Sequence, residues 1–391
     1  MRPLRVVQVI SSPWWTGAAE PALHLTADLA DRGHLLHFVC GEGERLEEEA
    51  REAGFPRPEG VEPTRSLNPL KLRRTVEDLA KLFEEVSAEI VHAHLSADHW
   101  LSVFAARRLK RRIHIVRSVH HPRAVKGDIL HRRLLWKETD AVVASSQHIG
   151  ELLLNRAQVP SRQVSVVPGG VDLRRFRPAS IEVRARGREL LGTPPDTLLI
   201  GIVSRLAPDR GHKPLFEAFR EVSARLPKAR LVVVGKGEHL PRLKERVAAL
   251  GLEERVDFPG YREDDLVEIL GAFDIFTLMA PGSEGTCRAA LEAMAMGLPC
   301  VVVDEGGLGE VVEHRVTGIV LPSRMPALVT EVLLDLLLDK QRRVAFGKAA
   351  RARAEKHYPR ELRAERVEAV YAGMLEFSQA VRMAQAGGRR W

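Results

Sequence analysis

The sequence predicts an α/β protein with two Rossmann-like domains that face a cleft. Short runs rich in β-branched residues alternate with amphipathic helical segments along most of the chain. The alternation stops in a stretch rich in Arg, Gly and Pro at 173–195 and then starts again. A chain of 391 residues is also too long for one ordinary core and suits two domains of similar size.

The first half opens with the strand, loop, helix, strand order of a parallel α/β sheet. Helices are expected at 22–30, which Gly33 ends, and at 72–86. Strands are expected at six β-rich runs, 6–10, 35–40, 90–94, 113–119, 140–145 and 164–167. Gly17 stands alone in the first turn, so the pattern G-x-G-x-x-G is absent there, which argues against a dinucleotide-dependent dehydrogenase.

The second half repeats the alternation. Strands are expected at 198–204, 230–234, 256–259, 275–278 and 300–303. Helices are expected at 215–226, 240–249, 289–296, 327–338 and 361–377. We therefore expect a first domain at 1–172, a linker at 173–195, a second domain at 196–357 and a C-terminal helix in 358–391. The cleft between two such domains is the default ligand site.

The stretch 283–299 contains a helix that is apolar almost all round. From 289 to 296 every residue except Glu292 is Ala, Leu or Met, which is typical of a buried helix. A carboxylate there needs a cation or several hydrogen-bond donors to offset its desolvation. Glu292 is therefore either a ligand-binding group or the ion-pair partner of Arg288, four residues earlier on the same helix face.

A second glutamate, Glu284, lies at the mouth of the same helix. Gly285 and Thr286 follow it and provide backbone freedom, a cap and amide groups where the helix dipole favours an anion. Two carboxylates beside such amides suit a ligand that carries both hydroxyl and phosphate groups.

Basic residues gather after the first strand of the second half. Arg205, Arg210 and Lys213 lie between that strand and the start of the next helix, as expected for a diphosphate clamp. A solvated loop is the alternative. The helix that begins near Thr286 is expected on the same carboxyl edge of the same sheet, which favours the clamp.

Histidines mark a strand end in the first half. His120 and His121 follow the strand at 113–119, and open α/β sheets bind ligands beyond the carboxyl ends of their strands. A histidine bonded to the backbone is the alternative. His92 and His94 could join them in a metal site, but no carboxylate or cysteine spacing supports one. We expect no metal, no zinc and no disulfide, because the three cysteines have no paired spacing, which fits a reducing cytosol.

The chain carries a net charge of +7, and part of its positive charge is clustered. The clustered residues are Arg107, Arg108, Lys110, Arg111, Arg112 and Arg117, followed by Arg132, Arg133 and Lys137 around Trp136. Nucleic acid, an anionic membrane face, phosphate-bearing substrates and a solvated helix face all fit this pattern. The low aromatic content argues against a base-stacking surface, and no apolar run is long enough to span a bilayer.

Together these residues resemble the retaining glycosyltransferases of family 4, which have the two-Rossmann-domain GT-B fold. The signature match is Glu284 and Glu292 followed by Ala-Met-Ala-Met-Gly-Leu-Pro. Supporting matches are found at 16–20, 90–94, 166–172 with Phe176, 204–206 and 210–211. The resemblance covers nearly the whole chain and implies that the C-terminal helix crosses back to the first domain.

The resemblance also implies roles for single residues. Arg205 and Arg210 hold the diphosphate of the donor; the family usually has Lys at the position of Arg210, so either Arg210 substitutes or Lys213 shares the role. Glu292 binds the ribose hydroxyls of a nucleotide sugar. Glu284 faces the transferred sugar.

Further contacts with the donor follow from the same resemblance. The amides of Gly285, Thr286 and Cys287 surround the sugar hydroxyls or the phosphate. His120 approaches the sugar and phosphate, and Gly17 gives the first loop room to approach the diphosphate. Tyr261 and Arg262 fall where the family holds the base.

The implied activity is transfer of a sugar from a nucleotide-sugar donor to an acceptor hydroxyl, with retention of configuration. No Asp-x-Asp for a bridging metal follows a strand, so we expect metal-independent transfer without a resident cofactor. The acceptor is expected to be a glycan or a lipid-linked precursor, with an anionic membrane surface as a candidate partner at 107–137 and no nucleic acid. A cytoplasmic protein, peripheral on the inner face of the membrane, would fit. The alternatives are a nucleotide-sugar epimerase and a donor-binding pseudo-enzyme that serves as a partner subunit.

Overall fold

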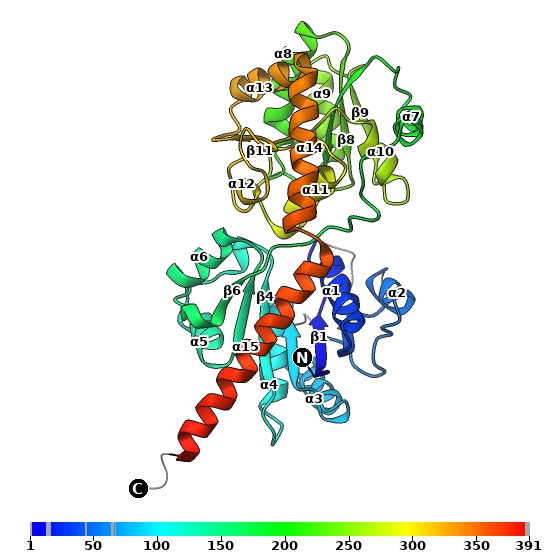
Figure 1. The fold of residues 1–391 in the computed structure, drawn as a ribbon. Coiled ribbons are helices and arrows are strands. Elements are labelled where there is room, and N and C mark those ends of the chain that lie inside the picture. The colour runs from blue at the N-terminus through cyan, green and yellow to red at the C-terminus, as the bar shows by residue number, and fades with distance from the viewer. Residues whose placement is uncertain (1, 13–16, 44, 64–65, 67, 388–391) are drawn as a thin grey trace. The chain divides into compact units, whose positions relative to one another are not determined.

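The computed structural model describes residues 2–12, 17–43, 45–63, 66 and 68–387, which form two compact units (Figure 1). Unit 1 contains the chain up to Gly169 together with the chain from Arg360 onward, and unit 2 runs from Gly170 to Pro359. The described residues of each unit form one six-stranded sheet, and every printed strand pairing in the two sheets is parallel. The predicted fold class is thus confirmed.

Unit 1 alternates strands and helices, and its last helix comes from the C-terminal end of the chain. Its elements are β1 (Arg5–Ile10), α1 (Ala19–Asp31), β2 (Leu35–Cys40), α2 (Arg45–Glu52), α3 (Pro69–Glu85), β3 (Ile90–Ala93), α4 (Ser96–Ala106), β4 (His114–Val119), α5 (Ile129–Lys137), β5 (Ala141–Ala144), α6 (Gln147–Asn155), β6 (Val164–Val166) and α15 (Arg360–Gly387). The strand order is β2-β1-β3-β4-β5-β6. The chain therefore reverses direction across the sheet between β1 and β3.

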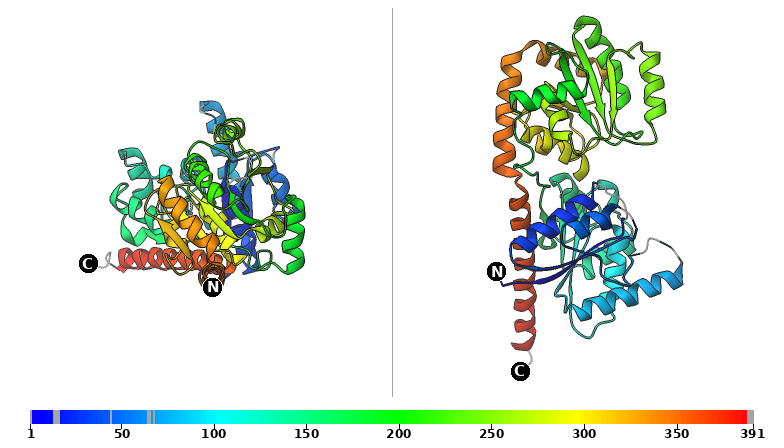
Figure 2. Two further views of the ribbon diagram at one scale, coloured as in Figure 1. Left: turned by 90° about the horizontal axis from the view of Figure 1, so that it is seen from above. Right: turned by 90° about the vertical axis from the view of Figure 1, so that its right-hand side faces the viewer.

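Helices cover both faces of this sheet. Side chains alternate along a strand, so Val6 and Val7 of β1 point to opposite faces. Val7 belongs to the core cluster formed with α3 and α4, whereas Val6 belongs to the cluster formed with α1 and α15. In the right-hand view of Figure 2, α15 and α3 accordingly lie on opposite sides of the strands of unit 1.

The C-terminal helix α15 is held in unit 1 by buried side chains and by an ion pair. Tyr371 is fully buried, and Arg360 makes a two-pronged ion pair with Asp28 of α1, with its Nη2 2.6 Å from Oδ1. Bidentate arginine–carboxylate pairs fix direction as well as distance. No helix within the described residues, α15 included, has the length and apolar character needed to cross a membrane.

Unit 2 repeats the architecture. Its elements are α7 (Ile181–Leu190), β7 (Leu198–Val203), α8 (His212–Arg225), β8 (Ala229–Val234), α9 (Leu240–Ala249), β9 (Val256–Gly260), α10 (Leu266–Ala272), β10 (Ile275–Leu278), α11 (Glu284–Ala295), β11 (Cys300–Val303), α12 (Leu308–Val311), β12 (Gly318–Leu321), α13 (Pro326–Leu338) and α14 (Lys340–His357). The strand order β12-β11-β10-β7-β8-β9 reverses between β7 and β10.

The segment 173–195, expected to be a linker, belongs to unit 2 and contains α7. Ser180 caps this helix, because its hydroxyl accepts from the amide of Val183 at 3.3 Å. Gly187 lets α7 approach α10 so closely that a Cβ at this position would lie 1.9 Å from the carbonyl oxygen of Glu268. Arg188 is buried and pairs with Asp274 at 3.1 Å. This segment is therefore packed structure.

Candidate functional site

The order of strands in unit 2 reverses between β7 and β10, and we call the region at the carboxyl ends of these two strands the crevice of unit 2. The loops that follow these two strands leave the sheet toward helices on opposite faces, which is where open α/β sheets bind ligands. The loop after β7 runs from Ser204 to Gly211, and the segment after β10 runs from Met279 to Ser283. The two segments touch, because the space beside Gly211 is filled by Met279.

Gly211 is needed for that contact. It has φ +71°, and a Cβ there would lie 2.1 Å from the carbonyl oxygen of Met279. Both the left-handed conformation and the close approach of two backbones exclude a larger residue. Gly211 therefore brings the basic loop against the segment that leads into α11.

Helix α11 is buried along most of its length, as its composition predicted. Glu284 and Glu292 are 4% and 7% exposed. Arg351 of α14 donates to the carbonyl oxygen of Ala295 at 2.8 Å and so occupies one of the acceptors at the C-terminal end of the helix. The N-terminal turn lies on the carboxyl edge of the sheet, next to the loop after β7.

The cap of α11 uses residues that were expected to serve a ligand. The Thr286 hydroxyl accepts from the amide of Ser283 at 2.6 Å and lies 2.9 Å from the carbonyl oxygen of Pro281, so this side chain closes the turn. The amide of Cys287 donates to the carbonyl oxygen of Ser283 at 2.8 Å, which corrects the expectation that it is available to the donor. Gly285 lies in the first turn, where α-helical amides have no acceptor within the helix.

Glu292 faces Arg288, with 3.5 Å between Oε1 and Nε. The ion pair weighed as the alternative for Glu292 is therefore present. Both residues lie on the helix that borders the crevice, and the Glu292 side chain is the less exposed of the two. Burial, with the charges of Glu310 and Glu284, raises the pKa of the nearby Cys287 thiol, so this sulfur stays protonated.

The basic loop after β7 has one exposed and one half-buried guanidinium. Arg205 is well exposed and pairs with Glu238 at 3.0 Å. Arg210 is more enclosed, with its Nε 3.5 Å from Asp209. Lys213 is exposed at the second position of α8. The loop and the first turn of α8 thus carry two guanidinium groups and an ammonium beyond the carboxyl end of β7.

A buried histidine that the sequence analysis missed holds this loop in shape. His212 Nε2 lies 3.0 Å from Ser204 Oγ, so the pair joins the first residue after β7 to the first residue of α8. Burial, with smaller contributions from Arg210 and His239, lowers the pKa of His212 to about 4, and the ring is neutral at pH 7. The sequence held a signal for this pair, because Ser204 and His212 lie on either side of Arg205 and Arg210.

Tyr261 and Arg262 follow β9, two strands away from β7. Tyr261 is exposed, and the Lys236 ammonium lies 4.4 Å from the centre of its ring. Arg262 pairs with Asp265 at 2.9 Å and donates to the carbonyl oxygen of Pro259 at 3.1 Å. Arg262 therefore shapes its own loop, whereas Tyr261 presents a ring at the edge of the sheet.

In unit 1 the expected residues lie on the carboxyl edge of the other sheet. His120 follows β4 and is buried, and Gly17 stands two residues before α1 and is half-buried. Thr16, from the same motif, lies outside the described residues. His94 also meets His120, with 3.2 Å between Nδ1 and Nε2.

The four histidines considered for a metal site do not form one cluster of ligands. His121 Nδ1 accepts from the amide of Arg123 at 3.0 Å in a turn, and both ring nitrogens of His92 and of His94 face protein atoms. Across the described residues, no group of three or more His, Cys, Asp and Glu side chains is arranged to hold a metal ion.

The basic cluster of unit 1 is largely paired. Arg107 pairs with Glu138, Arg108 with Glu77, Arg111 with Glu84 and Arg112 with Asp140. Arg117 is wrongly counted with the surface cluster, because strand β4 buries it at 3% exposure and burial lowers its pKa to about 10. Exposed cations remain on α5, where Arg133 and Lys137 flank the exposed Trp136.

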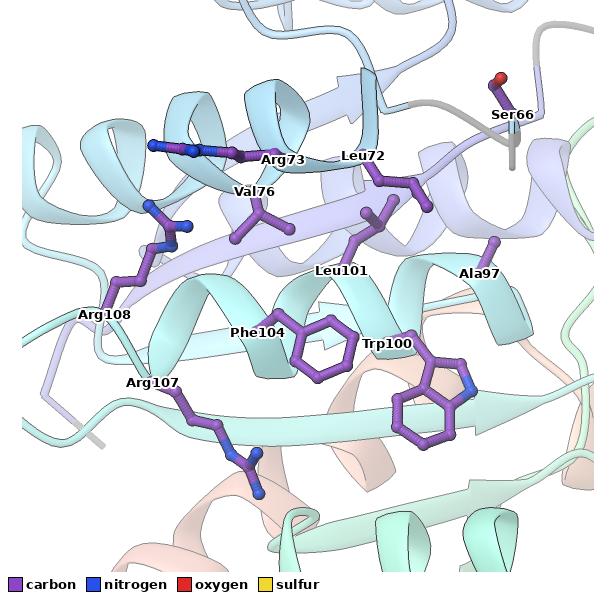
Figure 3. Close-up of a pocket in the computed structure, with 10 residues that line it drawn as sticks. All are labelled: Ser66, Leu72, Arg73, Val76, Ala97, Trp100, Leu101, Phe104, Arg107 and Arg108. Carbon is purple, nitrogen blue, oxygen red and sulfur yellow. The ribbon is translucent and has the colours of Figure 1, made fainter. Parts of the chain in front are cut away.

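A groove of about 540 Å³ lies between α3 and α4 (Figure 3). Apolar side chains form most of its lining, namely Leu72, Val76, Ala97, Trp100, Leu101 and Phe104. Arg73, Arg107 and Arg108 also line it, together with Ser66. Trp100 contacts His131 of α5, so the groove and α5 belong to one face of unit 1, which we call the α4–α5 face.

Two family models match the chain in succession. The model described as Glycosyltransferase Family 4 matches residues 15–175, and the model described as Glycosyl transferases group 1 matches residues 184–353. The boundary between them lies close to the boundary between the two units.

Relatives with curated descriptions are glycosyltransferases. The chain is 35% identical over 208 residues to the GDP-mannose-dependent monoacylated alpha-(1-6)-phosphatidylinositol monomannoside mannosyltransferase of Corynebacterium glutamicum, a match that covers 51% of this chain and 54% of the relative. It is 29% identical over 296 residues to the D-inositol 3-phosphate glycosyltransferase of Corynebacterium jeikeium, with 70% of each chain covered. The chain spans about half the length of the mannosyltransferase relatives it matches.

Solved structures share the fold. Anabaena HepE in complex with UDP and glucose superposes with a TM-score of 0.82 at 19% identity, covering 94% of this chain and 99% of HepE. A glycosyltransferase from Rickettsia africae superposes with the same TM-score at 20% identity and covers 96% of this chain.

Two parallel-sheet units, each with its own reversal of strand order, define the GT-B class of glycosyltransferases. Within that class, the chain belongs to glycosyltransferase family 4.

Proposed function

We propose that this chain transfers a sugar from a nucleoside diphosphate sugar to an acceptor hydroxyl, with retention of the anomeric configuration. One observation carries the proposal: the basic loop after β7 lies against the segment that leads into α11, whose first turn holds the buried Glu284. Cations and helical amides at a crevice suit a diphosphate, and buried carboxylates suit hydroxyl groups.

Departure of the nucleoside diphosphate is the step that these groups promote. When the bond between the sugar and the diphosphate breaks, negative charge grows on the leaving oxygen. Arg205, Arg210 and Lys213 stabilise this charge, together with the positive end of α11. These three cations would do the work of a metal ion in stabilising the leaving group. We therefore expect turnover to persist in a buffer that contains a metal chelator.

The remaining roles concern recognition of the donor. Glu284 accepts hydrogen bonds from the transferred sugar. When the donor binds, Glu292 leaves its ion pair with Arg288 and accepts hydrogen bonds from the ribose hydroxyls. Tyr261 presents a ring to the base, and Gly17 leaves space in the loop of unit 1. His120 is assigned to the transferred sugar.

For the acceptor we propose a lipid-linked or glycan precursor reached at an anionic membrane surface. Support comes from the α4–α5 face, where Phe104, Ile129, Leu130 and Trp136 are exposed. Exposed apolar groups beside basic ones are the combination that binds anionic bilayers. The named substrate of the Corynebacterium glutamicum relative, a phosphatidylinositol monomannoside, is an acceptor of this kind.

Turnover of a panel of nucleotide sugars tests the proposal. Wild-type protein is expected to release nucleoside diphosphate from at least one donor, and Arg205→Ala and Glu284→Ala are each expected to slow that release by about 10- to 100-fold. Arg220→Ala is the matched control, because Arg220 is an exposed arginine on α8 that pairs with Glu221. Equal rates in all four proteins would show that the crevice of unit 2 is not the donor site.

Vesicle co-sedimentation tests the membrane proposal separately. Ile129→Ser is expected to weaken binding to phosphatidylglycerol vesicles. Ile181→Ser is the control in unit 2, because the two isoleucines are 79% and 84% exposed. Equal binding of wild-type protein to phosphatidylglycerol and phosphatidylcholine vesicles would contradict the proposal.

A further inference from the structure

The two loops that follow β7 and β8 are joined by their backbones. The amide of Leu206 donates to the carbonyl oxygen of Lys236 at 3.0 Å, and the amide of His239 donates to the carbonyl oxygen of Leu206 at 3.1 Å. Gly235 has φ +143°, and a Cβ at this position would lie 1.9 Å from the carbonyl oxygen of Ser204. Backbone contacts therefore hold the loop after β8 beside the loop after β7.

This contact between the loops brings Glu238, in the loop after β8, to Arg205. Oε2 of Glu238 accepts from Nη2 of Arg205 at 3.0 Å. A hydrogen bond from its own backbone amide, with Arg205 as the second cause, lowers the pKa of Glu238, so the carboxylate is charged at pH 7. The side chains of Arg205 and Glu238 are 65% and 58% exposed. An exposed ion pair is weak, so an anionic ligand can displace the carboxylate.

The Glu238 carboxylate and a diphosphate would compete for the same guanidinium. Both are anions that accept hydrogen bonds from arginine and donate none. Binding of the diphosphate to Arg205 therefore breaks the pair and leaves one negative group close to another. The repulsion between them lowers the affinity most for the most negative ligand.

Sugar transfer makes the bound diphosphate more negative. In the donor the diphosphate is esterified at both ends. When the bond to the sugar breaks, its electron pair stays on the leaving oxygen, while the acceptor oxygen bonds to the sugar and loses its proton. The product then has a terminal phosphate whose second pKa is about 6, so at pH 7 it carries more negative charge than the donor. Arg205 without Glu238 would hold the product more tightly than the donor, and the site would stay occupied after transfer.

We infer that Glu238 promotes release of the nucleoside diphosphate by competing for Arg205, so that it weakens binding of the product more than binding of the donor. The inference rests on the proposed function, in which Arg205 binds the diphosphate. Glu238 is assigned no contact with the sugar or the base. Its ion pair with Arg205 forms again as the product leaves, and it opens when the next donor binds.

Calorimetry at low salt tests the inference by comparing the affinity for the product with the affinity for the donor. The probes are ADP, GDP, UDP and dTDP, each with its glucose or mannose conjugate. Glu238→Gln is expected to tighten binding of the nucleoside diphosphate by about 2- to 5-fold, with a smaller change for the sugar conjugate. Release of the diphosphate, followed by stopped flow, should slow by the same factor. Glu221→Gln is the matched control, because Glu221 is an exposed carboxylate of α8 that pairs with Arg220.

Arg205→Ala separates this inference from the proposed function. If Glu238 acts through Arg205, Glu238→Gln should have no further effect on affinity in the Arg205→Ala protein. An unchanged affinity for the diphosphate in Glu238→Gln would overturn the inference, and so would equal tightening of product and donor or tightening that persists in Arg205→Ala. If the wild type binds none of the probes, or if Arg205→Ala binds them as the wild type does, the proposed function fails and the inference fails with it.

Discussion

The hydroxyl of Tyr371 lies 2.7 Å from Nδ1 of His92, and this contact joins residues that are 279 positions apart in the sequence. Tyr371 belongs to α15 and His92 to β3. Both side chains are fully buried, so neither polar atom has water as an alternative partner. A side-chain hydrogen bond therefore joins the C-terminal helix to a strand of the sheet of unit 1.

Tyr371→Phe is expected to destabilise unit 1 by about 1–3 kcal/mol, because it leaves a buried imidazole nitrogen without its partner. The urea midpoint of the transition that reports unit 1 measures the effect. Glu376→Gln, an exposed change on the same helix, is expected to leave the midpoint unchanged. A wild-type midpoint in Tyr371→Phe would show that the bond between Tyr371 and His92 contributes nothing measurable to the stability of unit 1.

Gly211→Ala is expected to destabilise unit 2 by more than the strain of its left-handed backbone conformation alone. Gly251→Ala is the matched control, because Gly251 has φ +63° and no atom within 4 Å of a built Cβ. The control should lose about 1–2 kcal/mol of stability through strain, and Gly211→Ala about 1–3 kcal/mol more through the clash with Met279. Thermal unfolding compares the two variants. Equal losses would mean that the loop relaxes around the added methyl group.

Glu292→Gln and Arg288→Gln distinguish the two roles of Glu292. If Glu292 binds the ribose, Glu292→Gln should raise donor KM by about 10- to 100-fold, whereas Arg288→Gln should change it by less than about 5-fold. Initial-rate kinetics at varied donor concentration measure both values. A KM that changes equally in both variants, or in neither, would assign Glu292 to the ion pair alone.

The stability of unit 2 is expected to fall in acid because of His212. Its pKa is lowered from 6.5 to about 4 in the folded chain, so the unfolded chain binds the proton more tightly. The stabilisation is fully present above pH 6.5 and is lost as the pH falls from 6.5 toward 4. A shift of this size corresponds to about 3 kcal/mol.

His212→Gln tests this pH dependence. The amide does not titrate but still offers a partner to Ser204 Oγ. Urea midpoints of the transition that reports unit 2, measured at about pH 7.5 and about pH 4.5, should differ less in the variant than in the wild type. An identical difference in both proteins would mean that other groups cause the acid sensitivity.

The sequence predicted strands β1 to β11 and the buried part of α11 because their composition leaves few alternatives, whereas β12 was not predicted. The run from 289 to 296 is apolar except for Glu292, and its residues up to Ala295 form the buried part of α11. The prediction of a linker at 173–195 was wrong, and it was made because Arg, Gly and Pro are common in linkers. There Gly187 serves close helix packing and Arg188 a buried ion pair, which only the tertiary structure reveals.

The positions of charges were harder to predict than the positions of apolar residues. Arg117 looked like one more member of a basic cluster, yet it lies in strand β4, whose six residues are all buried because helices cover both faces of the sheet. The partners of the other arginines of the cluster come from distant acids, as when Arg107 pairs with Glu138. Sequence spacing reveals neighbours on one helix, such as Arg288 and Glu292, but not partners that the fold brings together.

The most direct test of the account is the affinity of the chain for nucleoside diphosphate and nucleoside monophosphate of the base that its donor carries. Calorimetry gives the ratio of the two affinities in the wild type and in Arg205→Ala. If the loop after β7 holds the diphosphate, the ratio should be large in the wild type and about 10-fold smaller in the variant. The same ratio in both proteins would contradict the central claim that Arg205 binds the diphosphate of the donor.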